Sequence, residues 1–319
     1  MIDGIESSLS LLQTWLFEQA VEPLMYAFGL MGWLEQAYEG LEWVVLGAVQ
    51  LVLLYALLRP LEALWPAERL NNRRAARVDV IYTVLHRLGF FPLIFFVLLT
   101  PLALASSRLM REAGLMPLQI DDLWPGVTDI AWVSFLLYLV VLDFVDYWIH
   151  RAQHRWGWWW ALHALHHSQQ QMTFWADNRN HLLDDLIRDA ILAAVALAIG
   201  AEPGQFVGIV LLTRALQSLH HANVRLGFGP FEPVLVSPVF HRRHHAIGTG
   251  HEGVRRGCNF AVLLPVWDLW FGTADFSRRI EATGIRDQLP QPLGRGRDYG
   301  AGFWSQQWLG LKRLINHSA

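Results

Sequence analysis

Cysteine and lysine are almost absent from this sequence. Of its 319 residues only Cys258 is a cysteine, which excludes an intrachain disulfide and any cysteine-rich zinc or iron–sulfur site. Lys312 is the only lysine, and 17% of the residues are charged, against roughly 25% in soluble domains. Because 53% of the residues are apolar, the composition predicts a membrane protein. The net charge of −3 gives no sign of nucleic-acid binding.

Positive charge is missing from the start of the chain. No lysine or arginine precedes Arg59, whereas residues 3–42 contain seven acidic residues. A signal peptide begins with a basic segment, so we expect none here. Several arginines then follow between positions 59 and 77. Because positive charge marks the cytoplasmic side of a membrane, the N-terminus is predicted outside and residues 59–77 inside.

Apolar segments long enough to approach the roughly 30 Å of a bilayer core occur three times, at residues 43–58, 79–105 and 131–149. Residues 8–34 contain Glu18 and Glu22 and either span the membrane or lie at its surface. Residues 186–200 and 204–219 are each too short to cross alone and are separated by AEPG. We expect them to form a helical hairpin that enters and leaves at one face.

These segments predict an all-α integral membrane fold with about four transmembrane helices, the hairpin included. The alternation of spans places the histidine-rich segments on the cytoplasmic side, in a helical cap that continues through residues 222–319. Within it, residues 304–315 have the pattern of an interfacial amphipathic helix. We expect the protein in a membrane, most simply the bacterial inner membrane, with its site facing the cytoplasm.

Histidine is concentrated in one part of the chain, with twelve of fourteen histidines between positions 150 and 251. Three clusters stand out, HRAQH (His150, His154), HALHH (His163, His166, His167) and HRRHH (His241, His244, His245). Helical residues three or four apart share a face, so each cluster can direct its imidazoles at one point. Eight imidazoles without thiolates suit two ions of iron, zinc or copper. His181 and His221, at the two ends of the hairpin, are further candidate ligands.

Two aspartates precede the first cluster on the same helical stripe. A histidine that binds metal usually donates its second N–H to a carboxylate or a carbonyl. Asp146, four residues before His150, is therefore a candidate partner, with Asp143 behind it. Both could equally cap the helix or pair with arginine. We interpret Arg242 and Arg243, like the other arginines beside the clusters, as topology signals. Isolated histidines such as His251 are interpreted as surface or satisfied core residues.

Motifs in fixed order resemble those of the fatty acid hydroxylase superfamily, also called the sterol desaturase family. They are HRAQH, HALHHS, NRNH, HHAN, SPVFHRRHH and the closing NFAVLLPVWDLWFGT. The resemblance covers roughly residues 130–275 and divides the chain into an N-terminal membrane region (1–78), a catalytic domain (79–275) and a tail (276–319).

The resemblance implies a di-iron enzyme that uses O2 and two electrons to hydroxylate or desaturate a lipid such as a sterol or a fatty acyl chain. The implied ligands are the eight clustered histidines, with His181 and His221 next. Zinc also binds such sites, especially after purification in air. Some members carry a fused haem domain with an HPGG motif, which is absent here, so a separate ferredoxin, cytochrome or reductase is expected as electron donor.

Other classes of protein fit less well. A membrane-embedded zinc-dependent hydrolase, the main alternative, calls for a catalytic glutamate beside its ligands, and HExxH does not occur. A di-iron carboxylate protein calls for ExxH pairs, which we do not find. A haem carrier places single histidines on facing helices. A transport or structural protein leaves eight ordered imidazoles unexplained.

Overall fold

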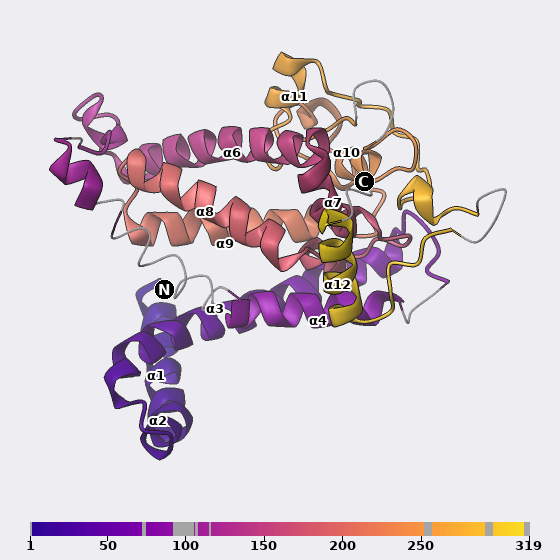
Figure 1. Ribbon diagram of the computed structural model, residues 1–319. Helices are drawn as coiled ribbons and strands as arrows, with labels where there is room; N and C mark the ends of the chain where they lie inside the picture. The colour runs from indigo at the N-terminus through magenta and orange to yellow at the C-terminus, as the bar shows by residue number, and fades with distance from the viewer. Residues whose placement is uncertain are drawn as a thin grey trace.

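The computed structural model describes residues 2–71, 75–91, 105, 108–114, 116–251, 257–290 and 296–315. Within these residues every regular element is a helix, and β pairing is limited to two isolated bridges. The predicted all-α fold is confirmed. In Figure 1 the N-terminal helices α1 (Ile2–Leu16) and α2 (Glu22–Ala27) project away from a body in which longer helices lie side by side.

Two stretches of described helix are long and apolar enough to cross a membrane, Met31–Leu64 and Ala131–Arg155. The first joins the short turn η2 (Met31–Trp33) to α3 (Leu34–Leu64), and a π-helical turn η1 (Phe17–Val21) lies upstream. The second is α6. The predicted spans at 43–58 and 131–149 fall inside these helices. Much of the third, 79–105, lies outside the described residues, which contain its beginning in α4 (Ala75–Arg87).

Helix α4 packs closely against α3 at a glycine. A Cβ atom on Gly47 would lie 1.6 Å from the carbonyl oxygen of Arg87, so only glycine permits this approach. Arg87 interrupts an otherwise apolar segment, yet it is buried and forms an ion pair with Asp177 at 2.9 Å. Its guanidinium also donates to Ser218 Oγ at 2.6 Å. The close approach of α4 to α3 therefore holds the buried guanidinium of Arg87 next to the Asp177 carboxylate.

We expect Gly47→Ala to lower the free energy of unfolding by roughly 1–3 kcal/mol, the usual effect of overpacking a filled interior. The added methyl group forces α4 away and moves Arg87 from Asp177. The thermal unfolding midpoint in detergent measures this. Gly32→Ala is the matched control because nothing lies within 4 Å of a Cβ atom there. Equal midpoints for the two variants would contradict the close approach.

Three helices lie side by side in the body, α6, α8 (Leu182–Ala198) and α9 (Pro203–His221) (Figure 1). Tyr138 and Leu142 from α6 share one apolar core with side chains of α8 and α9. Pro203 begins α9, where its missing N–H costs nothing. The helical pair predicted at 186–200 and 204–219 is confirmed. Near its turn lies η3 (Ile120–Asp122), whose Ile120 N–H donates to Ile199.

The remaining helices gather at the opposite end of the body (Figure 1). They are α7 (Gly157–His167), η4 (Phe174–Asn178), η5 (Gly229–Phe231), α10 (Pro238–His244), α11 (Val266–Phe271), η6 (Arg286–Gln288) and α12 (Phe303–Ile315). Helix α12 corresponds to the amphipathic segment predicted at 304–315 and packs on α7. At Gly310 it also touches His181, since a Cβ atom would lie 2.4 Å from that ring.

Candidate metal centre

The predicted histidine clusters meet where α6, α7, α9 and α10 come together. Because α6 continues past the apolar run to Arg155, it carries both histidines of the first cluster beyond the predicted span. Helix α10 is short and is started by Ser237, whose Oγ accepts the N–H of Phe240 at 3.1 Å. Ten histidines from these elements are 0–7% exposed: His150, His154, His163, His166, His167, His220, His221, His241, His244 and His245.

Eight of these side chains form two groups of four, each suited to one metal ion. In each group the nearest ring nitrogens lie within 4.8 Å of one another. The first histidine group consists of His150, His154, His167 and His244. The second histidine group consists of His166, His221, His241 and His245. The two groups adjoin, since the rings of His167 and His245 stack with centroids 4.4 Å apart.

The nitrogens of the second histidine group are too close to be explained by hydrogen bonds alone. His221 Nε2 lies 3.2 Å from His166 Nε2 and 3.1 Å from His241 Nε2. His221 Nδ1 contacts the Gln217 carbonyl at 2.9 Å and must donate there, so neutral His221 has a single lone pair at Nε2 for its two neighbours. Only one of them can donate to it, and His241 Nε2 has a further contact with His245 Nε2 at 3.2 Å. A cation among these nitrogens resolves the conflict.

Two members of the first histidine group, His150 and His244, have the outer hydrogen bonds typical of metal ligands. His150 Nδ1 donates to the Phe260 carbonyl at 2.8 Å, and His244 Nδ1 donates to the Cys258 carbonyl at 2.7 Å. In the neutral rings this leaves lone pairs at Nε2. Both Nε2 atoms are buried and have no hydrogen-bond partner within the described residues. The residues present therefore fit a bound metal ion.

Burial also keeps these histidines in the form that binds metal. Desolvation, reinforced by the neighbouring imidazoles, holds the pKa of His166, His167, His241 and His245 well below 6.5. The pKa of His244 is lowered in the same way, against the opposing effect of its bond to Cys258. The five rings are therefore neutral at pH 7, with lone pairs available to a cation.

His163 lies between the groups and belongs to neither. Its ring centroid is 5.2 Å from that of His150 and 5.3 Å from that of His166. Its Nδ1 is 2.9 Å from a carboxylate oxygen of Asp184, whose other oxygen accepts from Gln153 at 2.7 Å and from Trp159 at 2.6 Å. Its Nε2 is buried without a hydrogen-bond partner in the described structure. Sequence reasoning missed Asp184, although NRNHLLDD places it one turn after His181.

The Phe260 carbonyl that accepts from His150 begins a clamped loop, residues 260–264, which follows the Cys258 carbonyl that accepts from His244. Asp143 accepts from the N–H groups of Leu263 and Leu264 at 2.9 and 3.1 Å, and from Trp267 Nε1 at 2.9 Å. Asp268 accepts from the N–H groups of Phe260 and Ala261. These bonds fix both ends of residues 260–264. The aspartates thus give the closing motif NFAVLLPVWDLWFGT a structural role.

Three further predicted site residues lie outside both histidine groups. His181 caps α8, accepting the Leu183 N–H at Nδ1, and its Nε2 donates to the Gln307 carbonyl at 2.9 Å. With both nitrogens engaged, it stands outside both groups. A carboxylate oxygen of Asp146 accepts a hydrogen bond from Arg188 Nε at 2.8 Å. Of the roles that the sequence left open for Asp146, pairing with arginine is the one observed. Asp143 holds the loop described above and touches the metal centre only through that loop.

Three neighbouring residues have contacts that the sequence did not indicate, although the burial of His251 agrees with its interpretation as a core residue. His251 is buried, with its ring 4.9 Å from that of His167 and 5.4 Å from that of Trp160, so it adjoins the first histidine group. Arg242 is buried and pairs with Glu68 at 2.6 Å, and Arg243 pairs with Asp275 at 2.8 Å. Through these ion pairs the two arginines connect α10 to Glu68 and to Asp275.

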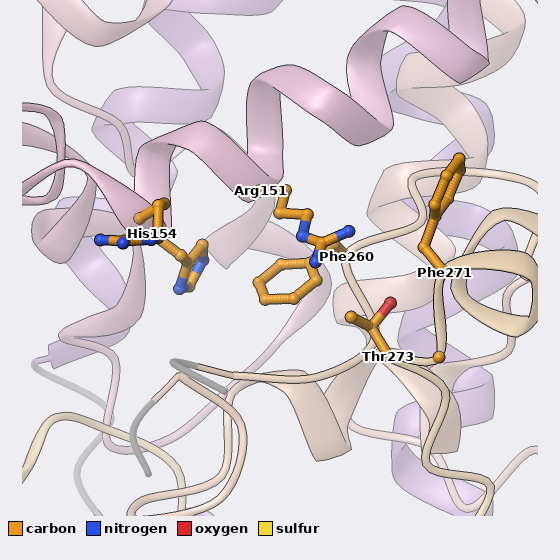
Figure 2. A pocket seen from close by; sticks show the side chains of 7 residues that line it. Arg151, His154, Phe260, Phe271 and Thr273 are labelled. Atoms are coloured by element: carbon orange, nitrogen blue, oxygen red, sulfur yellow. The ribbon is translucent and has the colours of Figure 1, made fainter. Parts of the chain in front are cut away.

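Two cavities reach the histidines. One of about 70 Å³ touches both groups and is lined by His150, His166, Asp185 and Arg188 among others. A larger one, of about 350 Å³, is lined by His154 of the first histidine group and by residues of α6 and of the segment around α11 (Figure 2). His154 lies at one side of it and Phe271 at the other, with Arg151 between them.

Comparisons with known proteins agree with this geometry. Residues 135–273 match the family model described as fatty acid hydroxylase. The chain is 27% identical to ornithine lipid hydroxylase OlsE of Rhizobium tropici, covering 79% of this chain and 75% of that protein. It is 31% identical to human alkylglycerol monooxygenase, over 56% of this chain but only 39% of that protein. No solved structure matches the chain.

A rice very-long-chain aldehyde decarbonylase, GL1-10, is 27% identical over 56% of this chain and 58% of its own length. Fold and site together define a helical protein with membrane-length helices and two buried histidine groups suited to metal ions. Residues 135–273 match the fatty acid hydroxylase family model, which agrees with the resemblance that the sequence motifs indicated.

Proposed function

We propose that this protein is an integral membrane di-iron oxygenase that hydroxylates or desaturates a lipid, using O2 and two electrons from a separate donor. The observation that carries the proposal is the pair of adjoining, buried, all-histidine groups. Each group would hold one iron ion. His163, with Nε2 between the groups, is the ninth candidate ligand.

The proposed reaction needs an oxidant that amino-acid side chains cannot supply. Two bound iron ions would supply the activation of O2 needed to attack an unactivated C–H bond. In hydroxylation one oxygen atom enters the C–H bond, and the other leaves as water with two electrons and two protons. The chain's own part is to keep water out, to fix the ligands and to orient one carbon of the lipid.

The arrangement of helices supports a lipid substrate. The smaller cavity is lined by residues of α6, α7, α8 and α9, with His150 and His166 among them, so it touches both histidine groups. On α3, the apolar side chains of Val52, Leu53 and Leu57 are 56–66% exposed, as expected of a surface that faces lipid. The relatives named above, a lipid hydroxylase and an alkylglycerol monooxygenase, act on the same class of molecule.

Membrane orientation follows from charge. The first lysine or arginine is Arg59, near the end of α3. Positive charge there favours a cytoplasmic position for this end of α3. Residues just beyond α3 contact the loop after α9, through the bond from the Ala67 N–H to the Asn223 carbonyl at 3.2 Å. We therefore place the metal centre at the cytoplasmic face, within reach of a soluble or membrane-bound electron donor.

Metal content tests the proposal. Protein purified in detergent without oxygen is expected to contain about two irons per chain. His166→Ala and His244→Ala remove one ligand from the second and the first histidine group, so each variant should lose iron. His181→Asn is the matched control, because asparagine also caps a helix and both nitrogens of His181 are already hydrogen-bonded. We expect it to keep both ions.

The same measurement can overturn the proposal. A haem, a single zinc ion or no metal in the wild-type protein excludes a di-iron oxygenase, and a single zinc ion would point to hydrolysis. Iron that stays at wild-type level in His166→Ala and His244→Ala would show that the two histidine groups do not hold it. With two irons established, O2 consumption with a reductase and candidate lipids gives the substrate.

A further inference from the structure

Three tryptophan rings form a stack at the start of α7. Trp158 and Trp159 stack with ring centroids 5.1 Å apart and an angle of 11° between the ring planes. Trp156, which precedes the helix, stacks on Trp159 at 5.8 Å and on Trp158 at 6.1 Å. These separations are typical of aromatic contacts. Trp159 is 2% exposed, whereas Trp156 and Trp158 are 50% and 44% exposed. The stack therefore connects a buried ring to the protein surface.

Hydrogen bonds join the buried end of the stack to the histidines. Trp159 Nε1 donates to one oxygen of Asp184 at 2.6 Å, and the other oxygen lies 2.9 Å from His163 Nδ1. His163 Nε2 lacks a hydrogen-bond partner in the described structure, and its ring lies between those of His150 and His166. A continuous path thus runs from the surface through Trp159 and Asp184 to the ring between the two histidine groups.

Asp184 also makes the indole of Trp159 easier to oxidise. Loss of one electron leaves a positive charge on an indole ring and makes its N–H acidic. The Asp184 carboxylate stabilises that charge, and it does so more strongly than in water because both side chains are 2% exposed. It also accepts the N–H in a short, charge-assisted hydrogen bond. The proton can therefore move to Asp184 as the electron leaves.

We propose that Trp159, Trp158 and Trp156 form a relay that carries oxidising equivalents from the metal centre to the protein surface when no lipid consumes them. The inference rests on the proposed function, because an oxidant that attacks an unactivated C–H bond also attacks the protein around it. Indole loses an electron more readily than imidazole does. The relay would therefore protect the histidines of both groups by moving the oxidation to exposed rings.

The transfers balance in electrons and protons. Trp159 gives one electron to the oxidised centre and its Nε1 proton to Asp184, which leaves a neutral indole radical. An electron from Trp158 or Trp156, together with the proton returned by Asp184, restores Trp159 and leaves the positive charge on an exposed ring. A thiol in solution then gives that ring one electron and loses its proton to water. Two such transfers supply the two electrons that the lipid C–H bond would have supplied, and two thiols end as one disulfide.

Mapping of oxidised tryptophan by mass spectrometry tests the relay. The iron-loaded, full-length protein in detergent is reduced and then exposed to O2 without lipid or thiol, with catalase present to remove free peroxide. We expect added oxygen at Trp156 and Trp158, because their oxidised rings react with water and O2 when no thiol restores them. Added thiol should suppress this product. Trp304 is the internal control, since it is 76% exposed on α12 and is not part of the stack.

Two variants identify the path. Trp159→Phe keeps an aromatic ring but removes the indole that gives up the electron, so oxidation of Trp156 and Trp158 should fall to the level of Trp304. Gln153→Leu is the matched control, because Gln153 Nε2 donates at 2.7 Å to the same Asp184 oxygen and carries no oxidisable ring. It should keep the oxidation at the surface. Iron is measured in every sample, and the product is expressed per bound iron.

Each outcome supports or overturns the relay. Oxidation of Trp156 and Trp158 above that of Trp304, lost in Trp159→Phe and kept in Gln153→Leu, supports it. Equal oxidation of the three exposed rings in the wild-type protein overturns it and indicates a diffusing oxidant, and this comparison needs no variant to fold. Unchanged oxidation in Trp159→Phe, or equal loss in both variants, overturns the role of Trp159.

Failure of the relay can be told apart from failure of the proposed function. Iron-loaded protein that consumes O2 and shows no oxidised tryptophan overturns the relay alone. Protein that binds no iron, or binds iron and consumes no O2, overturns the oxygenase proposal and the relay together.

Discussion

Asp184→Ala is expected to reduce both the stability of the protein and its metal content. Asp184 is 2% exposed and accepts hydrogen bonds from Gln153 and Trp159 as well as facing His163 Nδ1. Removing the carboxylate leaves three buried donors without an acceptor, at about 1–3 kcal/mol each before relaxation. We expect the free energy of unfolding to fall by roughly 3 kcal/mol or more.

Metal content should follow, because Asp184 sets the orientation of a histidine that lies between the two groups. Loss of such an outer carboxylate commonly weakens metal binding roughly 10- to 100-fold. Asp184→Asn keeps the shape and one acceptor oxygen, so it should fold better than the alanine variant while still binding metal less tightly. Thermal unfolding and a chelator titration, carried out on the same preparations, separate the two effects.

Asp189→Ala is the matched control on the same helix. Its side chain is 27% exposed, and its contact with Arg188 is 3.4 Å long. We expect an effect below about 1 kcal/mol, as for other partly exposed ion pairs. If Asp184→Ala unfolds at the wild-type temperature and holds metal as tightly, Asp184 does not position His163 and the role given to it here is wrong.

Local periodicity made the histidine clusters predictable, but not their division into two groups. Helical spacing indicated that His163, His166 and His167 face inward. Adjacent helical residues point about 100° apart, however, so His166 and His167 enter different groups, as do His244 and His245. Each HxxHH motif therefore contributes to both groups. This division between the groups follows from helix geometry. Which other histidines complete each group depends on contacts between helices that are distant in the sequence.

The partners of the ligands could not be predicted because they are remote or carry no sequence signal. A backbone carbonyl has the same chemistry at every residue, so nothing in the sequence marks Phe260 as the acceptor for His150. Asp143 and Asp146 were correctly placed on one stripe of α6. Their partners, Leu263 and Arg188, lie 120 and 42 residues away. Such pairings appear only once the chain has folded.

The positions of the long helices were predicted more accurately than the residues that pack against them. A helix depends on local sequence, whereas its packing partners are distant in the chain. The apolar runs at 43–58 and 131–149 both lie in long helices, since length and composition decide these locally. The polar continuations of those helices were not predicted. On α6 the continuation carries His150 and His154, because packing against α7 and the clamped loop stabilises it beyond the apolar run.

Asp268→Ala is expected to release metal from the first histidine group while the second keeps its ion. Asp268 is fully buried and accepts from the N–H groups of Phe260 and Ala261 at 2.9 and 2.8 Å. Without it the loop loses one of its two clamps. The carbonyls that orient His150 and His244 then move. Elemental analysis should show about one iron per chain instead of about two.

A double variant makes this test selective. His166 belongs to the second histidine group, so Asp268→Ala combined with His166→Ala should hold almost no iron, whereas each single variant holds about one. Asp275→Ala is the control, since that side chain is 31% exposed and pairs with Arg243 outside both groups. If Asp268→Ala folds, as judged by its unfolding transition, and loses both ions equally, the loop acts on the whole centre and the two groups do not bind metal independently.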